Sequence, residues 1–247
     1  MEKFFTNASQ VKDNNIHIDG EDSKHIIKVL RKRIGESIYI TVDQSKTYIC
    51  KIESFDNDIV KCNIVEEIQE NMETDINITL FQCIAKYEKM DDIIQKATQL
   101  GVKNVYPVIS NRVVVKLDEK TSQKKVERWA KIALEASKQC KRTVIPNIEN
   151  VISLINICNL ASKYDIILLA YENDTNSLKN ILKTCKEKEV KNIGVIIGPE
   201  GGFDEKEVEE LLKCNNIYSV SLGNRILRTE TASIFLISNI LYEFDEI

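Results

Sequence analysis

Apolar and polar positions alternate over short stretches in the first third of the chain. Three runs rich in β-branched residues follow one another at a spacing of about ten residues, with polar turns between them; they cover 38–42, 48–52 and 59–65. This alternation is typical of half-buried strands. The sequence therefore predicts a small β-barrel or meander that ends at the polar and acidic stretch 66–75.

From residue 76 onward the pattern changes to strands that alternate with helices. Apolar residues recur at helical spacing from Met90 to Leu100, where Gly101 follows as a C-terminal cap, and again along 119–140. The other expected helices cover about 176–187, 204–214 and 230–244, and the expected strands cover 76–85, 105–109, 166–171, 193–197 and 217–222. This order predicts a parallel sheet with helices on both faces. We expect two domains, 1–72 and 73–247.

Composition places the chain among ordinary globular proteins. Apolar residues make up 43% and charged residues 29% of its 247 residues, which excludes disorder as the main state. It lacks an apolar run of membrane-spanning length and an N-terminal signal pattern, so we expect a cytoplasmic protein without a membrane anchor. The seven cysteines form no Cys-x-x-Cys pair and there are two histidines, so we expect no metal site.

Basic residues are concentrated in two segments although the net charge is −4. Residues 24–33 hold five basic residues and no acid, and residues 116–142 hold nine basic and four acidic residues. An acidic protein with such segments can bind a polyanion, because affinity follows local charge. The alternative is that each segment is the solvated face of a helix.

Glycine is concentrated after the expected strand 193–197. Five of the eight glycines lie between residues 194 and 223, and the strand leads into Gly198-Pro199-Glu200-Gly201-Gly202-Phe203. Asp204 is in the position of a helix N-cap, with Glu207 as its capping-box partner. Ligands of open α/β sheets bind at such carboxyl ends of strands. A tight turn without a ligand is the alternative.

The motifs of two common nucleotide sites are missing from this loop. The chain contains neither the Gly-Lys-Ser/Thr of a P-loop nor the Gly-x-Gly-x-x-Gly of a dinucleotide-binding fold, which argues against a nicotinamide-dependent dehydrogenase. The loop also carries no cation that could hold a phosphate. A ligand that is itself positively charged fits better.

A second segment of similar character follows the last expected strand. It reads Leu222-Gly223-Asn224-Arg225-Ile226-Leu227-Arg228-Thr229-Glu230-Thr231-Ala232 and opens the last expected helix. It could be a capped helix with two surface arginines. Two loops of this kind at one end of a sheet favour a binding site instead.

Together the two segments resemble the signature of the ribosomal RNA small-subunit methyltransferase E family, which belongs to the SPOUT superfamily of knotted methyltransferases. Further positions that resemble this family are His25, 29–31, Gly35, 95–102, Pro107, Arg112, Glu135, Ala136, Gln139, Arg142 and Pro146. The sequence departs from the family at Lys3, Gln99 and Lys141, where arginine, an acid and glycine are usual. These departures lie outside the two segments and affect only details of RNA contact.

The resemblance implies an enzyme that methylates N3 of a uridine in the 16S rRNA of the small ribosomal subunit, with S-adenosylmethionine as methyl donor. It also implies a C-terminal α/β domain with a deep trefoil knot, an N-terminal PUA-like β-barrel that binds RNA, and a homodimer. Two alternatives stay open: a ribose 2′-O-methyltransferase of the same superfamily, and an rRNA-binding assembly factor that has lost its activity.

The resemblance also assigns roles to residues. The cofactor would be bound by Leu169, Ala170, Gly198, Pro199, Glu200, Gly201, Gly202, Leu222, Gly223, Ile226, Leu227, Arg228, Thr231 and Ala232, and the RNA by His25, Lys28, Arg31, Arg33, Gln139 and Arg142. Uridine N3 is a poor nucleophile until its imino proton leaves, so we expect Arg228 with Arg112 to stabilise the uracil anion. Glu230 or Glu200 would orient an arginine or accept the proton, unless Glu230 only favours the helix dipole.

Overall fold

The computed structural model describes residues 1–69, 72–86, 88–114 and 118–246. It divides into two compact units. The N-terminal unit consists of residues 1–73 and 137–145, and the C-terminal unit consists of residues 74–136 and 146–247. The chain therefore returns to the N-terminal unit after it has begun the C-terminal one.

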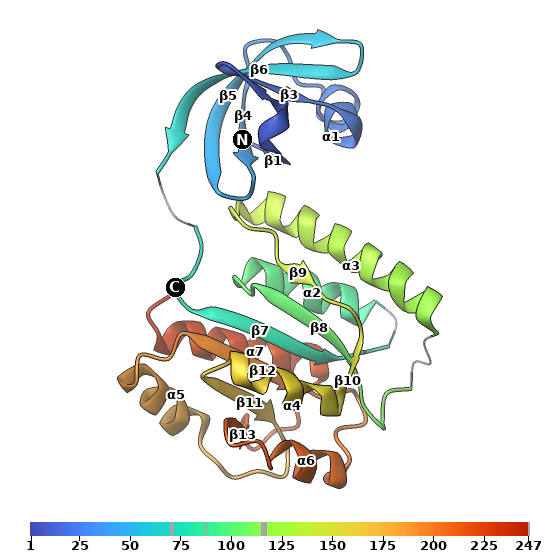
Figure 1. Ribbon diagram of the computed structural model, residues 1–247, viewed down its shortest axis with the longest axis vertical. Coiled ribbons are helices and arrows are strands. Elements are labelled where there is room, and N and C mark those ends of the chain that lie inside the picture. The colour runs from blue at the N-terminus through green and yellow to red at the C-terminus, as the bar shows by residue number, and fades with distance from the viewer. Residues whose placement is uncertain (70–71, 87, 115–117, 247) are drawn as a thin grey trace. The chain divides into compact units, whose positions relative to one another are not determined.

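The N-terminal unit is built on a six-stranded sheet (Figure 1). Its strands are β1 (Lys3–Thr6), β2 (Val11–Lys12), β3 (Asn15–Ile18), β4 (Ser37–Val42), β5 (Lys46–Asp56) and β6 (Ile59–Ile68), in the order β1-β4-β5-β6-β3-β2. Among these described strands, β1 and β4 pair in parallel and the other neighbours pair antiparallel. The three predicted strands are confirmed as β4, β5 and β6, whereas β1 to β3 were missed because each is too short to show a period.

Three short helices accompany this sheet: η1 (Ala8–Gln10), α1 (Gly20–Lys24) and η2 (His25–Val29). Ile26 of η2 is fully buried and joins a core with Phe4, Ile16 and Ile38. Register shifts along β5 mark irregularities in its pairing with β6, at Ile49/Cys50 and Ile52/Ser54. Bulges of this kind increase twist, which lets a small sheet bend around a core.

Residues 137–145, here called the strap, are held in the N-terminal unit by polar contacts. Glu73 Oε2 lies 2.6 Å from Arg142 Nη2, and Glu73 Oε1 accepts hydrogen bonds from the backbone N–H groups of Thr143 and Val144, both at 3.0 Å. Lys3 Nζ donates to the carbonyl of Lys141 at 3.0 Å. One buried carboxylate therefore fixes three successive residues of the strap.

The C-terminal unit is a parallel sheet covered on both faces, as predicted. Its strands are β7 (Asn77–Cys83), β8 (Asn104–Ile109), β9 (Asn147–Ile148), β10 (Ile152–Ser153), β11 (Ile166–Ala170), β12 (Asn192–Ile197) and β13 (Ile217–Val220). The order is β10-β8-β7-β12-β11-β13, with β9 paired to β8. The central strands β7, β12 and β11 are buried along almost their whole length, as expected of strands covered on both sides.

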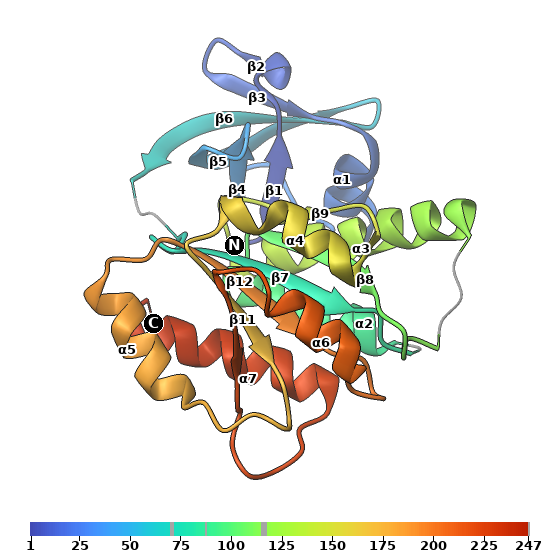
Figure 2. The same cartoon turned by 60° about the horizontal axis from the view of Figure 1, so that its bottom comes forward.

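The helices of this unit are α2 (Lys89–Gln99), η3 (Leu154–Asn156), α4 (Ile157–Leu160), η4 (Ala161–Lys163), α5 (Leu178–Glu187), α6 (Glu205–Leu211), α7 (Thr229–Glu243) and most of α3 (Glu119–Cys140), whose last residues, 137–140, belong to the strap. Residues of α2, α3, α5 and α7 pack on one face, and residues of α4 and α6 pack on the other (Figure 2). The predicted helices are confirmed, and α3 has the bounds expected from the sequence.

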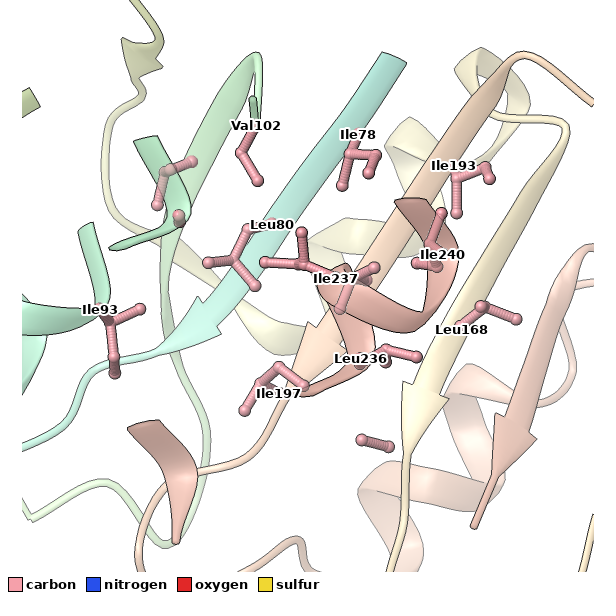
Figure 3. Close-up of a cluster of buried hydrophobic side chains, with 14 of the residues drawn as sticks. Ile78, Leu80, Ile93, Val102, Leu168, Ile193, Ile197, Leu236, Ile237 and Ile240 are labelled. Carbon is pink, nitrogen blue, oxygen red and sulfur yellow. The ribbon is translucent and has the colours of Figure 1, made fainter. Parts of the chain in front are cut away.

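Successive residues of each strand point to opposite cores. Leu168 contributes to the face that carries α7, where Leu236 and Ile237 pack against the sheet (Figure 3), and Leu169 contributes to the face that carries α6. Among the described residues no helix combines the length and apolarity that a membrane crossing needs.

Two of the predicted helix caps can be compared with the structure. Gly101 follows α2 with a φ of +85°, and the Asp204 side chain accepts a hydrogen bond from the Lys206 N–H at 3.1 Å, so both caps are confirmed. The capping box is wrong, because Glu207 Oε1 accepts the Asn111 N–H at 2.8 Å. Glu207 thus ties the start of α6 to the segment after β8.

Candidate functional site

A cavity of about 600 Å³ lies at the carboxyl ends of β11, β12 and β13. It is lined by residues of both segments singled out in the sequence, here called the first loop (198–203) and the second loop (221–228). These loops are separated by α6 and β13 in the chain, and the parallel sheet brings them to the same edge. The expectation that they share one site agrees with this geometry.

Most of the expected cofactor-binding residues line this cavity. They are Ala170, Gly198, Pro199, Glu200, Gly201, Gly202, Leu222, Gly223, Ile226, Leu227, Arg228 and Ala232. Leu169 is fully buried in the core on the face of the sheet that carries α6. Thr231 lines a neighbouring hollow with Ile234 and Phe235. The side chains of these two residues therefore do not line the cavity.

Two glycines allow the first loop to bend as it does. A Cβ on Gly198 would come within 2.9 Å of the buried Phe203 ring. Gly202 has a φ of +67°, and a Cβ there would lie 2.5 Å from Glu172 Oε1. Any larger residue would have to displace the ring or the carboxylate, in the second case with a strained backbone as well.

A chain of hydrogen bonds joins the first loop to the start of α7. The Thr229 hydroxyl donates to the carbonyl of Gly198 at 2.7 Å, and Gln82 Nε2 donates to Thr229 Oγ1 at 2.9 Å. Gln82 is fully buried at the end of β7. This residue was missed in the sequence, because a single glutamine at a strand end carries no distinctive pattern.

Lys89 places a positive charge next to the first loop. This contact was not predicted from the sequence. Its Nζ lies 3.2 Å from Glu200 Oε1 and 3.7 Å from Glu230 Oε2. Burial raises the pKa of Glu200, but hydrogen bonds from its own backbone N–H, the Lys86 N–H and Lys89 outweigh this effect and lower the pKa overall. Glu200 is therefore ionised at neutral pH.

The two arginines expected to act on the substrate both lie near the first loop. Arg228 is exposed, lines the cavity and occupies the N-cap position of α7. Arg112, which follows β8, donates from Nη1 to the carbonyl of Gly201 at 3.1 Å. Glu230 does not line the cavity and faces Lys89. The ion pairs of Glu200 and Glu230 thus involve a lysine, where the sequence had suggested an arginine.

The expected RNA-binding residues lie in the N-terminal unit, in the segment 24–33 and the strap. Lys28, Arg31 and Arg33 are exposed around the end of η2, and Gln139 is exposed in the strap. His25 packs edge-on against Phe4, with 6.3 Å between ring centroids. Arg142 is only 3% exposed and is bound by Glu73. Its guanidinium stabilises the strap, and this geometry does not support a contact between Arg142 and phosphate.

Two family models match the two parts of this chain. A model described as an RNA methyltransferase domain matches residues 72–241, and one described as an RNA methyltransferase PUA domain matches residues 18–65. Fold and site thus define an RNA methyltransferase with an N-terminal PUA-like domain. The ribosomal RNA small subunit methyltransferase E of Bacillus subtilis strain 168 is 34% identical over 92% of this chain and 89% of its own length. The chain belongs to the ribosomal RNA small subunit methyltransferase E family, as its motifs predicted.

Solved structures extend this similarity to the whole fold. A putative methyltransferase from Legionella pneumophila, in complex with the bound cofactor S-adenosylmethionine, has a TM-score of 0.87 at 28% identity and covers 97% of this chain and 96% of its own. The ribosomal RNA small subunit methyltransferase E of Neisseria gonorrhoeae, bound to S-adenosylmethionine, has a TM-score of 0.85 at 26% identity, with 98% and 97% covered. In the part of the chain that the structure describes, no group of histidine, cysteine and acidic side chains is arranged to hold a metal ion.

Proposed function

We propose that this protein transfers a methyl group from S-adenosylmethionine to N3 of a uridine in the 16S rRNA of the small ribosomal subunit. The observation that carries the proposal is the single cavity formed by the first and second loops at the carboxyl edge of the parallel sheet. Relatives with the same fold at 28% and 26% identity bind S-adenosylmethionine.

The residues around the cavity suit a cationic methyl donor. Glu172 and Asp174 place carboxylates along its wall, where they can attract a sulfonium, whereas the charge of Glu200 is paired with Lys89. Bent backbone in both loops offers N–H and C=O groups that can bind an adenine, and Ile226 and Leu227 offer apolar surface. S-adenosylmethionine supplies an activated methyl group when it is bound in such a site.

Arg228 is our candidate for the group that stabilises negative charge on the uracil. Its side chain lines the cavity and is exposed, so a base placed at the cavity mouth can approach it. A cation at that position favours loss of the imino proton and lowers the energy of the anion that attacks the methyl group. Arg112 holds the Gly201 carbonyl and contributes by shaping the first loop.

Exposed basic residues of the N-terminal unit are our candidates for RNA contacts. Lys28, Arg31 and Arg33 are exposed around the end of η2. Contacts of this kind with phosphates position the RNA, and they do not read its sequence. Because N3 lies on the Watson–Crick edge, the target uridine has to be unpaired or flipped out of its helix to react.

We further propose a deep trefoil knot in the C-terminal domain, a domain boundary near residue 72, and a homodimer. For the homodimer, the outer side of α7 carries two exposed aromatic residues, Phe235 at 40% and Tyr242 at 71%. Aromatic residues are enriched in the interfaces between protein subunits. Light scattering of the purified protein should give twice the mass of the chain, and Phe235→Glu should shift the protein towards monomer.

The reaction is tested by incubating the protein with radiolabelled S-adenosylmethionine and small ribosomal subunits that lack the modification. We expect label in the rRNA, and nuclease digestion with mass spectrometry should identify 3-methyluridine. A 2′-O-methylated nucleoside would indicate the ribose methyltransferase, and cofactor binding without transfer would indicate an assembly factor. Arg228→Ala should lower turnover about 100-fold at saturating cofactor and RNA if Arg228 stabilises the anion.

A further inference from the structure

Three separate parts of the chain meet at the ammonium group of Lys89. Lys89 is the first residue of α2, Glu200 belongs to the first loop, and Glu230 is the second residue of α7, directly after the second loop. The Lys89 side chain is 28% exposed and lines the cavity. One cation thus pairs with a carboxylate at each of the two segments that form the site.

The pair with Glu230 is partly removed from water. Glu230 Oε2 is buried, and it accepts no hydrogen bond from the described residues. Lys89 Nζ, 3.7 Å away, supplies a counter-charge for it. The loss of its counter-charge destabilises a partly buried carboxylate, so removal of Lys89 should shift the Glu230 side chain and the first turn of α7 that carries it.

Glu200, in the first loop, forms an ion pair with the same lysine. Its Oε1 lies 3.2 Å from Lys89 Nζ and accepts the backbone N–H of Lys86 at 3.1 Å. Without the ammonium group, the carboxylates of Glu200 and Glu230 would face each other with no positive charge between them. Their repulsion would widen the cavity at the point where the two loops meet.

From these contacts we propose that Lys89 is a positioning residue that sets the spacing of the two loops for the methyl donor. The role rests on the proposed function, because it assumes that the cavity binds S-adenosylmethionine. Two carboxylates already neutralise the ammonium group, so Lys89 is unsuited to stabilise a uracil anion. It acts on the reaction through Glu200 and Glu230.

The neutral hydrogen-bond chain from Gln82 through Thr229 to Gly198 offers a second connection between the same segments. Because this chain does not depend on Lys89, a Lys89 variant should still fold. The loss of Lys89 should therefore appear in the affinity for the cofactor more than in the thermal unfolding of the whole protein.

The test is calorimetric titration of the full-length protein with S-adenosylmethionine. Lys89→Met should weaken binding at least about tenfold, whereas Lys89→Arg, which keeps the charge, should stay within about threefold of wild type. Glu230→Gln removes the buried charge, so the double variant Lys89→Met/Glu230→Gln should bind more tightly than Lys89→Met alone. The control is Lys186→Met on α5, where Lys186 pairs with Asp245 at 2.6 Å and does not line the cavity; its affinity should be that of wild type.

The double variant separates charge balance from simple loss of a side chain. If Lys89 acted only by filling space, Lys89→Met and Lys89→Arg, which are both long and unbranched, would bind the cofactor alike, or the addition of Glu230→Gln would fail to tighten binding by the Lys89→Met protein. Either result, or a Lys89→Met protein within twofold of wild type, would overturn the role of Lys89. Wild-type protein that fails to bind S-adenosylmethionine would instead contradict the proposed function itself.

Discussion

Gly202 and Gly20 share a left-handed backbone conformation and differ in what surrounds them. Their φ angles are +67° and +64°. A Cβ on Gly202 would meet Glu172 Oε1 at 2.5 Å, and a Cβ on Gly20 would meet nothing within 4 Å. An alanine at either position would strain the backbone, and only an alanine at Gly202 would also clash inside the proposed cofactor cavity. A comparison of the two variants therefore distinguishes strain from the clash.

For Gly202→Ala we expect about threefold weaker binding of S-adenosylmethionine, because the new methyl group strains the first loop and turns the exposed Glu172 carboxylate out of its place at the cavity wall. Gly20→Ala should cost about 1 kcal/mol of unfolding free energy and leave cofactor affinity unchanged. Calorimetry and urea denaturation of both variants provide the measurement. Equal loss of affinity in the two variants would contradict a specific effect at the cavity.

Lys3 is a buried amine in the N-terminal unit, only 4% exposed. Burial lowers the pKa of Lys3 from 10.5 to about 8, although the nearby Glu73 opposes the shift. Between these two values the unfolded chain binds a proton that the folded protein has lost. The contribution of Lys3 to the free energy of unfolding therefore rises from pH 8 to pH 10.5.

The measurement is the difference in unfolding free energy between wild type and Lys3→Met at several pH values. The comparison cancels the titration of other groups. We expect the difference to change in favour of wild type by up to about 3 kcal/mol from pH 8 to pH 10.5, since one pKa unit corresponds to about 1.4 kcal/mol. A difference that stays constant with pH would show that the Lys3 amine is solvated.

At the scale of elements, one carboxylate holds three successive residues of the strap. Glu73 binds the Arg142 guanidinium and the backbone N–H groups of Thr143 and Val144. Glu73→Ala should lower the free energy of unfolding by about 3 kcal/mol, because it leaves a buried cation and two amide groups without their acceptor. Urea denaturation checks this value. Glu66→Ala, at an exposed position of β6, is the control and should change stability by less than about 0.5 kcal/mol.

The elements that could be predicted from the sequence are those with a repeated pattern. In α3 the apolar residues Val126, Trp129 and Ala133 recur at helical spacing, and all three are buried. The strands β1 to β3 have at most four residues, which is too short for a period to emerge. The strap could not be predicted, because Glu73 and Arg142 are 69 residues apart and only the folded chain brings them together.

The contrast between local sequence patterns and contacts made only by the folded chain also applies to the candidate functional site. Both loops could be identified because each carries its distinctive residues in one continuous segment. Three residues of the cavity region lie outside both loops, so no local motif marks them: Gln82 at the end of β7, Lys89 at the start of α2 and Glu172 shortly after β11. Their positions could have indicated them. Gln82 lies near the end of the expected strand 76–85, Lys89 follows that strand, and Glu172 follows the expected strand 166–171. The carboxyl ends of parallel strands lie at one edge of the sheet, where ligands bind.

At the scale of the whole molecule, binding to a polyanion should depend on salt. We expect the affinity for unstructured rRNA fragments to fall steeply as salt is added, because each phosphate contact releases counterions. Changing Lys28, Arg31 and Arg33 together to Gln should reduce the slope of log affinity against log salt by about 2, at about 0.7 per contact with a single strand. Filter binding at several salt concentrations measures this slope.

Lys46→Gln provides the control for that experiment. Lys46 is an exposed lysine of the same unit and faces Glu67 at 3.7 Å, so its charge is already partly neutralised. Its replacement should leave the slope unchanged. If the triple variant also kept the wild-type slope, the basic segment 24–33 would be solvated surface.

The division of the chain has a practical consequence for gene truncation. A fragment that stops at residue 73 would lack the strap, so its terminal glutamate would lose the partners that it has in the intact protein. A fragment that starts at residue 74 would carry residues 137–145 without the surface to which they attach. Either half expressed alone would therefore expose the surface between the strap and the rest of the N-terminal unit. Expression should use the whole gene, or an N-terminal fragment to which the strap has been fused.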